Sequence, residues 1–375
     1  MRNRSFLSIL FLTLFFSLSA QEKRLRDYGI EIGVVKTGLL NAITDVPGVM
    51  VGHQTLIKGD SIRTGVTAII PHSGNLFQQK VPAAIYLGNG FGKLAGYSQV
   101  KELGNLETPI VLTNTLSVAT GVNALVSHTL LLPENEKVRS VNAVVGETND
   151  GYLNDIRGRH VTEKDILQAI KNAKPGKVEE GNVGAGTGTI CFGFKGGIGT
   201  SSRVVPKNAG GYTVGVLAQT NFGGMLKIAS VDVGKQMGHY SDNFKYATDG
   251  SCMMVVFTNA PLDSRNLERL AKRAMLGLAR TGGIASNGSG DYVIAVSTAK
   301  ECRIPYNSDN AVQTLPSLRN SAMTPLFLAT IEATEEAILN SLFAAQTMTG
   351  RNGHEIKALP KKQVLEMLKA AGKIR

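Results

Sequence analysis

Short apolar runs bounded by glycine or proline recur along most of the chain, and this pattern constrains the fold more than any other sequence feature. Runs of this length next to turn residues are typical of β-strands. The runs 49–57 and 64–71 flank the turn Lys58-Gly-Asp-Ser61 and predict a hairpin. Further strands are expected at 30–34, 83–87, 110–113, 143–146, 189–194, 212–220, 228–231, 255–257 and 292–297.

Helical patterns are fewer and lie between these runs. Thr162-Glu-Lys-Asp165 resembles a capping box at the start of a helix over 163–173. Apolar residues spaced three and four apart after Ser264 predict a second amphipathic helix, which Gly282-Gly283 would end. Other helices are expected at 122–132, 325–345 and 360–371. Many short strands with few helices favour an α+β layered domain over a regular βαβ repeat.

Residues 1–20 have the pattern of a secretory signal peptide. Arg2 and Arg4 precede the apolar run 6–16, and the small residues Ser17-Leu-Ser-Ala20 offer a cleavage site. The run is shorter than the roughly 20 residues of a membrane span. We therefore expect a mature protein that is soluble, periplasmic or secreted, and without stable membrane insertion.

Charge and metal-binding patterns make two classes of function improbable. The formal net charge is +11, but lysine and arginine are scattered, which disfavours a nucleic-acid partner. The six histidines are never paired at ligand spacing and no Cys-x-x-Cys occurs, so no metal is expected. Cys191 and Cys252 have apolar neighbours and are interpreted as small buried residues rather than disulfide partners.

Two glycine-rich stretches fail the nucleotide-binding patterns they partly resemble. In 88–93 the first glycine of the phosphate-binding loop would fall on Leu87, and no serine or threonine follows Lys93. In 184–188 the third glycine of the dinucleotide pattern would fall on Thr189. Tight turns against a sheet are the expected role of both, and no cofactor is expected.

Asp249-Gly250-Ser251 places a hydroxyl directly before an apolar strand. An ordinary turn is one interpretation, because Asp-Gly is common turn chemistry. Self-cleavage is the other: Gly250 leaves its carbonyl accessible, and Ser251 would become a new N-terminus. An N-terminal amine, with a pKa of about 7.7–8.0, can act as the base of its own nucleophile. The chain has no Gly-x-Ser-x-Gly elbow, so a serine hydrolase would need such a base.

Several motifs together resemble the family of L-aminopeptidase/D-esterases and β-peptidyl aminopeptidases. Asp249-Gly-Ser251 is followed by matching segments at 259–271 and 286–292. Further matching segments lie at 43–49, 63–67, 147–155, 219–224 and 347–353. The resemblance therefore covers nearly all of residues 30–355.

The resemblance implies self-cleavage between Gly250 and Ser251 into two chains, 21–250 and 251–375, that remain a single domain. The implied fold is an α+β, αββα four-layer sandwich. The implied assembly is a homo-oligomer, often a tetramer. The implied activity is hydrolysis of N-terminal residues from peptides, amino-acid amides or esters with a free amino group.

The resemblance also assigns roles to residues of this sequence. Ser251 is the implied nucleophile, and its freed amine the base. Ser289 would hydrogen-bond the amine or the hydroxyl, and Asp291 would orient that network. Further implied roles are the oxyanion donor for Asn221, recognition of the substrate amine for Glu147, and a second oxyanion donor at either Asn149 or Tyr152.

Two alternatives remain at this point. An acyl transferase of the ornithine acetyltransferase type shares the self-cleaving architecture, but it is expected to use threonine where this chain has Ser251. A non-catalytic envelope binding protein could share the scaffold. The presence of Ser251, Ser289, Asp291 and Asn221 counts against that alternative.

Overall fold

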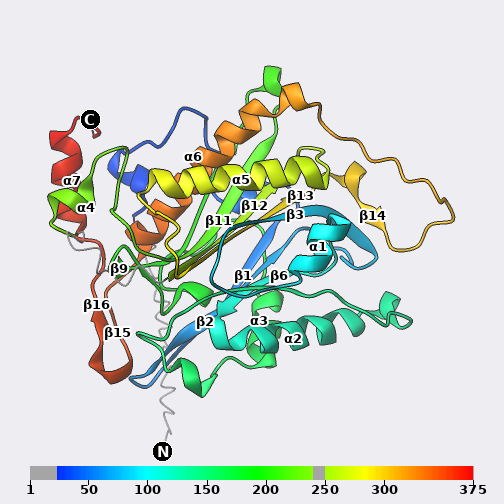
Figure 1. Cartoon of the computed structure of the whole chain (residues 1–375), viewed down its shortest axis with the longest axis horizontal. Helices are drawn as coiled ribbons and strands as arrows, with labels where there is room; N and C mark the ends of the chain where they lie inside the picture. The colour runs from blue at the N-terminus through cyan, green and yellow to red at the C-terminus, as the bar shows by residue number, and fades with distance from the viewer. Residues whose placement is uncertain (1–22, 240–249, 375) are drawn as a thin grey trace, which may run out of the picture.

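The computed structural model describes residues 23–239 and 250–374. The expected signal peptide and Asp249 therefore lie outside the described residues. Two sheets form the centre of the molecule (Figure 1). The larger has the strand order β10-β11-β12-β13-β3-β14, with β5 paired beside it on β3. The smaller has the order β1-β2-β6-β7-β4.

The strands of the larger sheet include the longest in the chain. They are β3 (Gln79–Gly90), β5 (Asn105–Leu106), β10 (Gly197–Val204), β11 (Thr213–Asn221), β12 (Gly250–Thr258), β13 (Ser289–Ser297) and β14 (Ile304–Pro305). Strand β12 lies at the centre, antiparallel to β11 and parallel to β13. Ser251, the second residue of β12, therefore has a paired strand on each side.

The smaller sheet confirms the predicted hairpin. Its strands are β1 (Met50–Lys58), β2 (Ile62–Ile70), β4 (Leu94–Ala95), β6 (Ile110–Asn114) and β7 (Val144–Thr148). β1 and β2 pair along their full length, from Met50 opposite Ile70 to Lys58 opposite Ile62. Two small ribbons complete the strands: β8 (Ile190–Cys191) with β9 (Phe194–Lys195), and β15 (Met348–Thr349) with β16 (Glu355–Ile356).

Helices pack on both sheets. In Figure 1, α5 (Ser264–Arg280) and α6 (Thr324–Ala344) cross the larger sheet, and α2 (Val118–Leu130) and α3 (Glu163–Lys171) lie by the smaller one. The other α-helices are α1 (Tyr97–Leu103), α4 (Val233–Gln236) and α7 (Lys361–Ala370). Among the helices of residues 23–239 and 250–374, none combines the length and the hydrophobicity that a membrane span requires.

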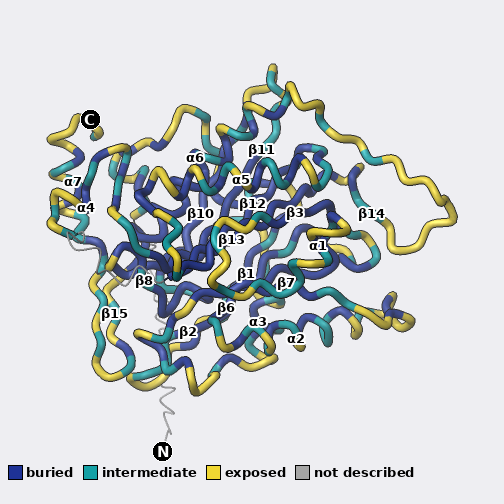
Figure 2. The backbone as a smooth tube through the Cα atoms, in the orientation of Figure 1, coloured by how far each residue is buried: buried dark blue, intermediate teal, exposed yellow. Residues whose placement is uncertain are grey.

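Alternate side chains of the central strand enter two different cores. Cys252, Met254 and Val256 belong to the core that includes residues of α5 and α6. Met253, Val255 and Phe257 belong to the core that joins the two sheets, with residues such as Ile69 and Leu112. A third core lies between the smaller sheet and the helices α2 and α3. The buried tube segments in Figure 2 follow these strands.

Several sequence predictions were wrong in detail. Residues 30–34 form no strand, 189–194 forms the β8–β9 hairpin, and 228–231 is a single bridge. Strand β10, with the sequence Gly-Ile-Gly-Thr-Ser-Ser-Arg-Val, was missed because its buried face is polar. The expected helices at 163–173, after Ser264, at 325–345 and at 360–371 are present, and the one at 122–132 begins four residues earlier, at Val118.

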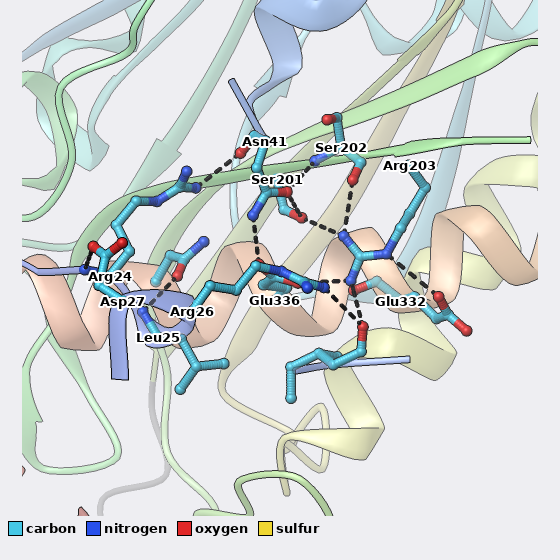
Figure 3. Close-up of polar contacts among 12 residues, drawn as sticks. Arg24, Leu25, Arg26, Asp27, Asn41, Ser201, Ser202, Arg203, Glu332 and Glu336 are labelled. Carbon is cyan, nitrogen blue, oxygen red and sulfur yellow. Dashed lines mark hydrogen bonds and ion pairs between the residues drawn. The ribbon is translucent and has the colours of Figure 1, made fainter. Parts of the chain in front are cut away.

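Strand β10 can bury polar side chains because Arg203, one of its residues, belongs to a buried ionic network (Figure 3). The Arg203 guanidinium, which is fully buried, lies 2.7 Å from Glu336 and 3.3 Å from Glu332, both on α6. Arg26 contacts the second oxygen of Glu336 at 2.8 Å. Burial alone would raise the pKa of Glu336, but Arg203 and Arg26 hold it below its usual value. The network joins the N-terminal segment, the sheet and α6.

Candidate active site

Ser251 is the second residue of β12 and is almost completely buried. It is in register with Asn221 of β11 on one side and Gly290 of β13 on the other. Its Oγ donates to the carbonyl oxygen of Gly250 at 2.6 Å, and the Gly290 N–H approaches the same Oγ at 3.3 Å. The hydroxyl therefore lies against the carbonyl group of the bond that precedes it.

Gly250 and Gly290 lie next to Ser251 at positions where the surrounding atoms leave too little space for a side chain. A Cβ on Gly250 would lie 2.2 Å from the Asn221 carbonyl oxygen, so no larger residue fits there without movement of the backbone. A Cβ on Gly290 would lie 2.8 Å from the carbonyl oxygen of Phe91 and 3.1 Å from Ser251 Oγ. Glycine at 290 thus keeps the space in front of the Ser251 hydroxyl open.

Asn221 ends β11 opposite Ser251 and is 7 % exposed. Its Oδ1 accepts the backbone N–H of Ile190 at 2.9 Å. That bond fixes which end of the amide is the acceptor, so Nδ2 is the end that can donate to another group. A side-chain amide N–H group on the strand next to the nucleophile is the kind of donor that stabilises an oxyanion.

Ser289 and Asp291 lie on β13, in register with Gly250 and Cys252. Neighbours in register share a face of a sheet, so both side chains point away from the face that holds Ser251 Oγ. This geometry favours contact with the backbone nitrogen of Ser251 rather than with its hydroxyl. Ser289 Oγ and both carboxylate oxygens of Asp291 are buried and have no hydrogen-bond partner among the described residues.

The environment of Asp291 disfavours its charge. Burial raises the pKa of Asp291 to about 6. The Ser289 hydroxyl and the Cys252 N–H partly oppose this rise, although neither meets the geometry of a hydrogen bond to the carboxylate. Buried polar groups without partners are rare in folded proteins and call for an explanation. A cation placed between Ser289 and Asp291 would satisfy both.

Glu147 belongs to β7 of the smaller sheet and is also buried. Its Oε1 accepts the backbone N–H of Lys93 at 2.9 Å, and its Oε2 accepts the Thr115 hydroxyl. A Cβ on Gly92 would lie 3.2 Å from Glu147 Oε1 and 3.3 Å from the Cα of Gly290, so Gly92 separates Glu147 from the Ser251 strand pair. Burial raises the pKa of Glu147, and the Thr115 and Lys93 bonds oppose the rise.

The two candidates for a second oxyanion donor lie in surface positions. Asn149 is exposed, and its Oδ1 accepts the Gly151 N–H at 2.9 Å. Tyr152 is 49 % exposed, and its ring stacks on His354 at 4.4 Å between ring centroids. No contact within the described part of the chain joins either side chain to Ser251, so both roles stay predictions.

Sequence reasoning missed the glycine-rich stretch 88–93 as part of this site. Asn89 Nδ2 donates to the carbonyl oxygen of Ser286, and Phe91 N–H donates to that of Ser289. The stretch thus connects β13 with Glu147 and forms a wall beside Ser251. The sequence predicted only a tight turn against a sheet there, and the contacts with Ser286, Ser289 and Glu147 join residues far apart in the chain. Across residues 23–239 and 250–374, no group of three or more His, Cys, Asp or Glu could hold a metal ion.

Residues 41–356 match peptidase family S58. The chain belongs to this family. It is 42 % identical to the β-peptidyl aminopeptidase BapA of Sphingosinicella microcystinivorans, over 94 % of this chain and 93 % of that protein. The resemblance inferred from the sequence motifs is therefore confirmed.

Solved structures agree with this assignment. A Pyrococcus horikoshii OT3 protein is 48 % identical, with a TM-score of 0.87 over 93 % of this chain and 99 % of its own. The L-aminopeptidase D-Ala-esterase/amidase of Ochrobactrum anthropi, described as a variant of the N-terminal nucleophile (Ntn) hydrolase fold, is 35 % identical. Its TM-score is 0.86 over 94 % of this chain and 99 % of its own. The chain is an S58 aminopeptidase with a mixed α/β, single-domain fold of the Ntn type.

Proposed function

We propose that this protein is an exported, self-processing aminopeptidase and amidase whose nucleophile is Ser251. The observation that carries the proposal is the position of Ser251 Oγ, 2.6 Å from the Gly250 carbonyl oxygen and flanked by Asn221. Family membership supports a peptidase over the transferase and binding-protein alternatives. Export rests on the signal-peptide pattern in residues 1–20.

Processing would begin when Ser251 Oγ attacks the Gly250 carbonyl carbon. The C–N bond then breaks, the Ser251 nitrogen takes the proton, and the peptide becomes an ester. Water hydrolyses the ester, which leaves a Gly250 carboxylate and a Ser251 residue with a free amine and a free hydroxyl. The buried, unpartnered Ser289 hydroxyl and Asp291 carboxylate support this step, because the new amine would supply the missing partner.

The mature enzyme would consist of chains 21–250 and 251–375 in one four-layer αββα sandwich. The separate cores on each face of the larger sheet and on the outer face of the smaller sheet support this layering. Assembly of the cleaved units into a homotetramer is part of the same proposal and rests on the family resemblance.

Hydrolysis would follow the same chemistry on an external substrate. Ser251 Oγ attacks the substrate carbonyl, and the Ser251 amine takes the hydroxyl proton and passes it to the leaving amine. Asn221 Nδ2 donates to the oxyanion, and water releases the acyl group. Glu147 would pair with the substrate ammonium, so a free amino group is required. The substrates would be peptides, amides or esters with an N-terminal L-, D- or β-residue.

A panel of aminoacyl p-nitroanilides tests this function. L-alanyl, D-alanyl and β-alanyl substrates are compared with their N-acetylated forms, using the purified protein and Ser251→Ala. We expect release of p-nitroaniline from at least one free-amine substrate, none from the acetylated forms, and none with Ser251→Ala. Equal turnover of free and acetylated substrates, or activity in Ser251→Ala, would contradict the proposal.

A further inference from the structure

Lys195 is a buried lysine that the mechanism above does not use. It belongs to β9 and its side chain is fully buried. Its Nζ donates to the carbonyl oxygens of Gly186 at 3.0 Å and Gly196 at 2.8 Å. No carboxylate forms an ion pair with it within residues 23–239 and 250–374. A fully buried lysine without an ion-pair partner is rare, so its position calls for a specific role.

The two carbonyl groups belong to opposite ends of one loop. Gly186 ends the 3₁₀ turn Gly184–Gly186, and Gly196 follows the β8–β9 hairpin. Lys195 therefore closes the loop 186–196 from inside. Burial lowers the pKa of Lys195 to about 7, and Cys191 and Asp150 oppose this change. The charged and the neutral amine both carry N–H groups, so either form can donate to the two carbonyl oxygens.

The same hairpin is fastened to the end of β11, where Asn221 lies. Ile190 N–H donates to Asn221 Oδ1 at 2.9 Å, and Phe192 N–H donates to the Phe222 carbonyl oxygen at 2.8 Å. Gly197 N–H donates to Thr220 Oγ1 at 3.2 Å. Ile190 and Lys195 are in register across the hairpin. The orientation of the Asn221 amide thus depends on a loop that Lys195 holds closed.

We propose that Lys195 is a positioning residue for Asn221: by joining Gly186 and Gly196 it fixes Ile190 N–H, and with it the amide that donates to the oxyanion. The inference rests on the proposed function, in which Asn221 is the donor. Lys195 touches neither the substrate nor Ser251 in this account. Its effect reaches the reaction through one hydrogen bond to Asn221 Oδ1.

Lys195→Met tests the inference, because methionine has similar length and no donor. The matched control is Thr189→Val, which removes another donor to the Gly186 carbonyl oxygen, 3.0 Å away, without removing the bridge. We expect Lys195→Met to lower kcat by roughly 10- to 100-fold with little change in KM. This loss is smaller than the roughly 10²- to 10³-fold loss that is typical of removing an oxyanion donor itself. Thr189→Val should change kcat by less than about 3-fold.

A double-mutant cycle with Asn221→Ala separates positioning from general damage. If Lys195 acts through Asn221, Lys195→Met in the Asn221→Ala background should change kcat by less than about 3-fold. An equal loss in both backgrounds, or an unchanged kcat in the single variant, would overturn the inference. Lys195→Gln, whose shorter side chain keeps two amide N–H donors, is measured alongside and should lose less kcat than Lys195→Met. If Lys195→Met does not unfold cooperatively, the same cycle is run with Lys195→Leu, which also lacks a donor, and decides in its place.

Failure of this inference is distinguishable from failure of the proposed function. If the wild-type protein does not turn over free-amine substrates, the proposed function is wrong. If the wild-type protein is active but the Lys195 variants do not show the expected losses of kcat, only the Lys195 inference is wrong.

Discussion

Two buried polar clusters lie on the larger sheet, and they differ in how fully their groups are bonded. In the cluster around Arg203, the guanidinium contacts Glu332 and Glu336, and its remaining donors reach Ser201 Oγ and the carbonyl oxygens of Ser202 and Ile32. In the cluster around Ser251, Ser289 Oγ and the Asp291 carboxylate have no partner in the described chain. The bonded cluster should contribute to stability, and the unbonded one to chemistry.

Arg203→Met should give the largest effect and act on stability. Removal of the guanidinium leaves Glu332 and Glu336 buried beside a lost cation, which costs about 3–5 kcal/mol of unfolding free energy. The measurement is urea unfolding of the uncut Ser251→Ala chain, so that one chain unfolds. Lys101→Met is the control. It removes an exposed ion pair with Glu268 and should cost less than about 1 kcal/mol.

Asn221→Ala should give an effect nearly as large, but on rate. Loss of an oxyanion donor lowers kcat by roughly 10²- to 10³-fold, or about 3–4 kcal/mol of transition-state stabilisation. The unfolding free energy should fall by only about 1–2 kcal/mol, the cost of leaving Ile190 N–H without its acceptor. Steady-state kinetics and urea unfolding of the same preparation check both. A large loss of stability with unchanged kcat would show that Asn221 stabilises the fold and not the transition state.

Asp291→Asn should stabilise the uncut chain in a pH-dependent way. The pKa of Asp291 is raised to about 6 in the folded chain, so between pH 4 and 6 the folded state keeps a proton that the unfolded state loses. The stability of the uncut chain therefore falls as pH rises through this window. Relative to Ser251→Ala, the double variant Ser251→Ala/Asp291→Asn should gain roughly 3 kcal/mol at pH 7 and almost nothing at pH 3.5. An equal gain at both pH values would show that the carboxylate charge is not the cause.

Glu147→Gln should give the smallest effect and act on substrate binding. The amide keeps an oxygen for the Lys93 N–H but loses the charge that would pair with a substrate ammonium. KM for a free-amine p-nitroanilide should rise about 10-fold, or about 1.4 kcal/mol, with kcat within about 3-fold. If kcat falls and KM is unchanged, Glu147 acts in the chemical step instead.

The sequence was sufficient for elements whose pattern is local. The β1–β2 hairpin followed from two apolar runs around a turn, and α3 from its capping box and apolar face. Strand β10 was missed because Ser201 and Arg203 are buried through contacts with Asn41 and Glu336, residues far away in the chain. No local pattern distinguishes such a strand from a polar loop.

The candidate site, like strand β10, depends on contacts between residues that are far apart in the chain. The sequence neighbours of Ser251 allowed both an ordinary turn and a self-cleavage site, and the family resemblance favoured the second. The position of Ser251 beside Asn221 and Gly290 depends on the register of three strands. The family resemblance supplied Asn221, whereas Gly290 was not singled out from the sequence. Lys195 was missed because one lysine in a glycine-rich segment suggests a surface residue, and its burial depends on the hairpin and the 3₁₀ turn closing around it.

The most direct test of the account is the mass and N-terminal sequence of the purified protein. Wild-type protein and Ser251→Ala are denatured and examined by intact mass spectrometry and N-terminal sequencing. We expect two wild-type chains, one ending at Gly250 and one beginning at Ser251, and a single unbroken chain for Ser251→Ala. An unbroken wild-type chain that hydrolyses the substrates, or cleavage that persists in Ser251→Ala, would contradict it.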